Sequence, residues 1–166
     1  MSESNNTTVA VLRCEKYDTD LIVEKMYEAW KLSGGKEAVD ISGKRVLLKP
    51  NVLMDADPSK AVTTHPVFFH AAVRLMKKLG AAEIFAGDSP GFQGPGFKAK
   101  KCGLWDICQE EEITWYDFSS KTRIISCPDG KKVKHFQVSD IVDKVDMIIS
   151  LPKLKTHGLE KFTGAI

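Results

Sequence analysis

The sequence predicts an α/β domain, with a mostly parallel sheet and helices on both faces. Three observations lead to this prediction. Short apolar runs alternate along the chain with longer segments whose apolar residues recur at helical spacing. The 166 residues are enough for one domain with its own core, and 43% hydrophobic with 28% charged residues is a typical globular composition. We therefore expect a disordered tail over residues 1–8 and a single α/β domain over residues 9–166.

The first half of the chain is expected to hold two strands and two helices. The first strand is a short apolar run, Val-Ala-Val-Leu, bounded by polar residues. Asp18 or Thr19 can cap the first helix, and a glycine pair closes it. The second helix begins at Pro66, because proline is favoured in the first turn. In chain order the four elements cover residues 9–12, 19–32, 45–49 and 66–79.

The second half is expected to continue the alternation and to contain one hairpin. Pro128-Asp-Gly130 is a turn sequence between two strand-like runs, which predicts a β-hairpin inserted into the sheet or lying at its edge. The last strand is fully apolar and is followed by Pro152. The expected elements are strands at 83–87, 113–116 and 147–151, a short helix within 98–110, and hairpin strands at 123–127 and 132–136.

Charge and cysteine content exclude several classes of function. The 24 basic and 22 acidic side chains leave a net charge of +2, which is too small to indicate a nucleic-acid partner or an anionic membrane. The N-terminus lacks a secretion signal, and no apolar run approaches the roughly 18 residues of a membrane helix. The four cysteines lack C-x-x-C spacing, so no local iron–sulfur or zinc site is predicted. We expect a cytoplasmic protein with reduced thiols.

Four polar clusters follow the predicted strands or begin a helix on the same side of the sheet. Ligands of open parallel sheets bind beyond the carboxyl ends of the strands, so these clusters together predict a binding site. Lysines suit a carboxylate or phosphate, and histidine transfers protons near neutral pH. The clusters are Lys49-Pro-Asn51, Thr63-Thr-His-Pro66, Gly87-Asp-Ser-Pro-Gly91 and Lys153-Leu-Lys-Thr-His157.

Each candidate residue is given a role in this hypothesis. We expect proton transfer from His157, with Asp88 and His65 as further catalytic candidates. The expected substrate-binding residues are Lys49, Asn51, Thr64, Ser89, Lys153, Lys155 and Thr156. Simpler explanations compete with these roles: a lysine can extend into solvent, Thr64 can cap a helix, and Asp88 can close a turn.

These ordered motifs resemble a known family. Leu48-Lys-Pro-Asn51, Thr63-Thr-His-Pro66, Gly87-Asp-Ser-Pro-Gly91, Leu151-Pro-Lys-Leu-Lys-Thr-His-Gly158 and Thr163-Gly-Ala165 are similar to those of domain of unknown function 362. Members often carry a [4Fe–4S] module and are then named iron–sulfur cluster-binding proteins, but this chain has no such cysteine run. In the family the Thr-Gly-Ala-Ile run continues into a Lys-Asn pair and a further half-domain. The resemblance thus implies the N-terminal part of a longer family domain.

At the level of the fold, the order of elements also looks like the N-terminal part of nickel-pincer lactate racemases. In those enzymes a histidine of the comparable Pro-Lys-x-x-x-His loop acts as acid and base, which by analogy would assign that role to His157. The lysine that would hold the cofactor lies beyond residue 166.

Three functions follow as expectations. The first is an enzyme acting on a small anionic substrate, with its reaction class and cofactor unknown. The second is a redox accessory protein in which His65, Asp88 and His157 bind a metal and a ferredoxin-type partner or module supplies electrons. The third is a non-catalytic domain whose basic loop binds a partner.

Overall fold

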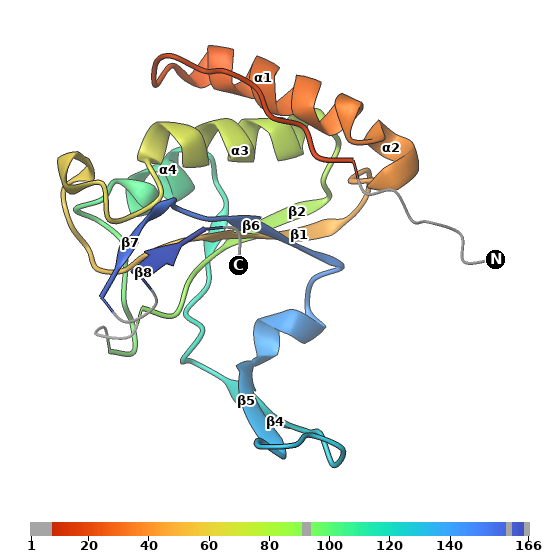
Figure 1. The fold of residues 1–166 in the computed structure, drawn as a ribbon, viewed down its shortest axis with the longest axis vertical. Helices are drawn as coiled ribbons and strands as arrows, with labels where there is room; N and C mark the ends of the chain where they lie inside the picture. Colours follow the sequence, from red (N-terminus) through yellow and green to blue (C-terminus); the bar gives the residue numbers. More distant parts are fainter. Residues whose placement is uncertain (1–7, 91–93, 159–160, 165–166) are drawn as a thin grey trace.

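A four-stranded parallel sheet forms the centre of the protein, as a computed structural model of the chain shows (Figure 1). The structure describes residues 8–90, 94–158 and 161–164. The strand order is β3-β2-β1-β6, and β1 pairs in parallel with both β2 and β6. The predicted α/β class and parallel sheet are therefore confirmed. The strands are β1 (Arg45–Pro50), β2 (Glu83–Ala86), β3 (Thr114–Trp115) and β6 (Met147–Leu151).

The α-helices all lie over one face of this sheet, in two layers (Figure 1). Helix α3 (Pro66–Lys78) packs directly on β1, and α1 (Thr19–Leu32) packs on α3. Both helices begin where the sequence predicts: the Asp18 side chain caps α1, and Pro66 opens α3. The short helices α2 (Gly35–Ala38) and α4 (Leu104–Glu110) flank them. The main core fills the space between, with Val46, Leu48, Phe69, Val73 and Leu104 fully buried.

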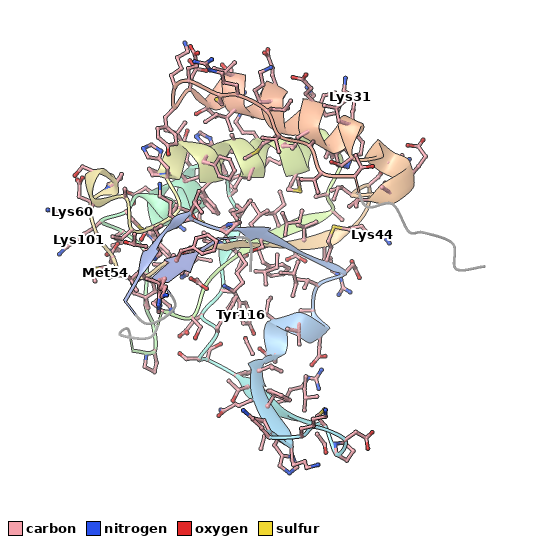
Figure 2. All side chains as sticks on the ribbon, viewed as in Figure 1. Lys31, Lys44, Met54, Lys60, Lys101 and Tyr116 are labelled. Carbon is pink, nitrogen blue, oxygen red and sulfur yellow. The ribbon has the colours of Figure 1, made fainter. Side chains whose placement is uncertain are left out.

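The second face of the sheet carries a one-turn 3-10 helix, η2 (Asp140–Asp143), and a projecting hairpin. Helical segments thus cover both faces, but unequally. Leu47, Phe85 and Ile141 form the small core of this side. Figure 2 labels Tyr116 here, and its hydroxyl donates to Asp140 at 2.5 Å. The hairpin consists of β4 (Thr122–Ser126) and β5 (His135–Ser139), which pair antiparallel and confirm the predicted insertion.

Three local predictions are wrong. Residues 9–12 form no strand but run back along α1 (Figure 1), with Val9 and Val11 exposed. The second hairpin strand starts at His135, not at residue 132, because Ser126 pairs with His135 and residues 127–134 form one longer loop.

The third error concerns the segment after β6, for which the expected elements include no strand. It contains β7 (Lys155–His157), which pairs antiparallel with β8 (Lys161–Thr163). Alternation along this segment leaves Lys153, Lys155 and His157 half-buried and Leu154 and Thr156 exposed. The two lysines therefore share one side of the segment.

Candidate functional site

The carboxyl ends of β1 and β2 are joined by an ion pair. Lys49 lies near the end of β1, and its Nζ is 2.7 Å from Oδ1 of Asp88, which lies just after β2. The other oxygen of Asp88 accepts a hydrogen bond from the Val52 N–H at 2.7 Å. The side chain of Asp88 is only 9% exposed, whereas that of Lys49 is 44% exposed. Asp88 is therefore a fixed anion, and Lys49 is held against it with access to solvent.

Thr64 connects three segments at the same edge of the sheet. Its buried hydroxyl donates to the carbonyl of Leu151 at 2.6 Å and accepts from the N–H of Asn51 at 2.9 Å. Its own N–H donates to the Asn51 carbonyl. These bonds occupy the hydroxyl, so Thr64 positions the ends of β1 and β6.

Lys155 brings a second amine toward Asp88 from β7. Its Nζ donates to the carbonyl of Val62 at 2.9 Å. Burial lowers the pKa of Lys155, the negative charge of Asp88 acts in the opposite direction, and the positive charge of Lys153 lowers the pKa further. Among the described residues, the Asp88 carboxylate thus stands with three lysines at this edge, and the summed charge of these four groups is positive.

His65 has a structural role at the start of α3. It is the N-cap residue, and its Nδ1 accepts a hydrogen bond from the Val67 N–H at 3.2 Å. Its ring stacks on Tyr17 with centroids 3.6 Å apart. Burial, followed by the charge of Lys153, lowers the pKa of His65. The ring is therefore neutral at pH 7, with Nδ1 already engaged and the proton on Nε2.

Many of the predicted site residues line one of two neighbouring hollows, and Pro152 lies in the wall of both. The first, of about 120 Å³, is polar and is lined by Lys49, Asn51, Asp88, Ser150 and Thr163. The second, of about 250 Å³, is lined by Tyr17, Thr64, His65, Phe68, Lys153 and Leu154. The four polar clusters do converge at one edge, but as two adjoining compartments.

The remaining predicted residues lie at the margins. Ser89 is exposed beside Asp88, and together with Lys49 it also lines a hollow on the second face of the sheet. Thr156 is exposed in β7, and His157 is half-buried at the end of that strand, opposite Lys161. Within the described ranges no three histidine, cysteine or acidic side chains are grouped as metal ligands. The postulated metal site of His65, Asp88 and His157 is therefore not assembled.

Sequence reasoning missed three residues that line these hollows. Ser150 was assigned to an apolar strand, although its position in β6 places it in the polar hollow. Thr163 was noted only within the small-residue run, yet its hydroxyl donates to the Lys153 carbonyl at 3.1 Å. Tyr17 reaches His65 across the fold, and no local pattern could have indicated that contact.

The fold and this edge define an α/β domain with a lysine-rich site at the carboxyl ends of its parallel strands. The chain belongs to the family described as domain of unknown function DUF362, whose profile matches residues 46–166. It is also similar to thylakoid-associated protein sll1697 of Synechocystis sp., with 29% identity over 151 residues. That alignment covers 91% of this chain and 46% of the relative, so the chain spans about half the relative's length. No solved structure matches.

Among the described residues, none of the helices has both the length and the apolar character needed to cross a membrane.

Proposed function

We propose that this chain binds a small anionic substrate in the polar hollow at the ends of β1, β2 and β6, and that it acts there as an enzyme. The observation that carries the proposal is the excess of positive charge around Asp88. Lys49 and Lys155 both approach this carboxylate, while Lys153 adds a third charge. A carboxylate or phosphate group would neutralise that excess.

The polar groups around the hollow suit a small, oriented ligand. Lys49 is partly open to solvent, so its amine can bind a ligand without breaking its contact with Asp88. Ser150 and Thr163 add hydroxyl groups to the wall. Asp88 has the role of a positioning residue, because its carboxylate holds Lys49 and the Val52 backbone in place.

We assign proton transfer to His157. It follows Lys155 by two residues in β7 and shares its half-buried side of the strand. Imidazole is suited to this role near neutral pH. His65 is less suited, because its Nδ1 is engaged by the backbone of α3.

Isotope exchange tests the catalytic part. The protein is incubated in D₂O with a panel of small 2-oxo and 2-hydroxy acids, and NMR follows the loss of a C3 proton from the oxo acids or of the C2 proton from the hydroxy acids. A base would remove that proton and solvent would return a deuteron. We expect exchange by the wild type and none by His157→Ala, with unchanged circular dichroism as the control for folding. Equal exchange by both proteins would contradict the role of His157, and binding without exchange of any acid would make the chain a binding domain.

We also propose a cytoplasmic location. All four cysteines lie within the described residues and are free thiols, which is consistent with a reducing compartment. Fractionation of cells that express a tagged chain would test this location. Recovery of the chain with the membrane fraction would contradict it.

A further inference from the structure

The basic edge adjoins a larger apolar groove on the helical side of the molecule. This groove has a volume of about 420 Å³ and lies between the segment that precedes α1 and the helices α1 and α3 (Figure 1). Its apolar wall is formed by Leu12, Ile22, Met26, Ala29 and Phe68. Most of its lining surface is therefore hydrocarbon, unlike that of the hollow at Lys49.

The groove and the hollow at His65 are neighbours. Tyr17 and Phe68 line both of them, so one aromatic pair separates the apolar groove from the compartment that holds Lys153. Pro152 then separates that compartment from the polar hollow at Lys49. The three spaces form a series that changes from apolar to cationic, and the two larger ones have volumes in the usual range of ligand pockets or close to it.

The charge in the middle compartment is that of Lys153. Lys153 is near enough to His65 and Lys155 to lower the pKa of each, and no carboxylate among the described residues is paired with it. A cation at the end of an apolar groove favours a ligand with a single anionic head and a hydrocarbon tail.

We infer that the compartment next to the polar hollow takes an amphipathic carboxylic acid, whose head group binds at Lys153 and whose hydrocarbon tail lies in the groove of Leu12, Ile22, Met26 and Ala29. This inference rests on the proposed function in one respect, namely that the lysine-rich edge receives an anion. It goes further in naming the class of substrate. Tyr17 and Phe68 then contact the first carbons of the tail.

Chain length provides the test. Butanoate, octanoate and decanoate are titrated into the protein by calorimetry, below the concentrations at which they form micelles. Each fully buried methylene strengthens binding by about fourfold. In a groove that is open on one side, we expect decanoate to bind at least tenfold more tightly than butanoate. Decyltrimethylammonium, with a similar tail and a positive head, should bind at least tenfold more weakly than decanoate.

Two variants locate the tail and the head. Ala29→Trp fills the groove and should remove the dependence on chain length, whereas Ala82→Trp, on the exposed turn before β2, is the matched control and should retain it. Lys153→Gln should weaken all the acids by a similar factor. Circular dichroism and the melting temperature of each variant verify that it is folded.

The outcomes separate this inference from the proposed function. Binding that depends on Lys49 and Lys155 but not on chain length would overturn the amphipathic ligand and leave the anion site standing. A tail effect that Ala29→Trp removes, together with malonate binding that does not change when Lys49 and Lys155 are replaced by Met, would support the groove and overturn the site at the polar hollow. A concentration-dependent dimer that Ala29→Trp breaks, without binding of any acid, would assign the groove to a second copy of the chain and overturn the inference.

Discussion

Thr64→Val tests whether Thr64 positions the site or binds substrate. The substitution keeps the shape of the side chain but removes a buried hydroxyl that bonds Leu151 and Asn51. The Asn51 N–H keeps a longer bond of 3.3 Å to the Leu151 carbonyl, so neither group is left wholly unpaired. We therefore expect a loss of about 1–2 kcal/mol in the free energy of unfolding, in the range for a buried polar group that loses one partner.

For a chain of this size, that loss corresponds to a melting temperature lower by about 2–8 °C. Urea denaturation followed by circular dichroism gives the free energy directly. Thr114→Val, on the exposed side of β3, is the matched control and should change stability by less than about 0.5 kcal/mol. Unchanged stability of Thr64→Val together with lost anion binding would refute the positioning role and make Thr64 a ligand of the substrate.

Three further predictions concern the rest of the fold. Burial alone would raise the pKa of Glu111, but hydrogen bonds from a lysine and a histidine outweigh burial and lower the pKa. The ionised Glu111 carboxylate therefore stabilises the fold above its unfolded-state pKa, and this stabilisation is lost as pH falls through the folded-state pKa. In urea denaturation, the difference in unfolding free energy between wild type and Glu111→Gln should shrink toward acid pH, and a constant difference would contradict this. Burial raises the pKa of Cys102 to about 11 and that of Cys108 to about 12, so mass spectrometry after brief iodoacetamide treatment at pH 8 should find Cys14 modified and these two intact. A Cβ at Gly87 would lie 2.5 Å from a backbone oxygen, so Gly87→Ala should cost about 1–3 kcal/mol, and a melting temperature equal to that of the wild type would disprove the close approach.

The sequence predicts those parts of the fold whose signals are local. The helix beginning at Pro66 and the strand at 45–50 follow from capping residues and apolar spacing, and both are present within a residue or two. The run at 9–12 misled because its valines satisfy a strand pattern but face solvent. Nothing local indicates that this segment packs along a helix instead of entering the sheet.

The site, like the fold, could be predicted from the sequence only where the signal is local or follows from the topology of the sheet. Parallel topology is enough to bring Lys49 and Asp88 to one edge, because both follow paired strands. The contacts that give the other residues their roles cross the fold: Tyr17 on His65, and Lys155 on the Val62 carbonyl. Local spacing carries no information about such contacts, and for that reason the division into two hollows could not be foreseen.

The central claim is that lysines at the carboxyl edge of the sheet bind an anion, and calorimetric titration with malonate tests it most directly. The double variant Lys49→Met/Lys155→Met keeps the length of both side chains and removes both charges. The matched control is Lys44→Met, at the opposite end of β1 (Figure 2). We predict malonate binding at least tenfold weaker in the double variant and unchanged in the control, with all three proteins folded. Equal affinity in the wild type and the double variant, or no malonate binding by the wild type, would contradict the account.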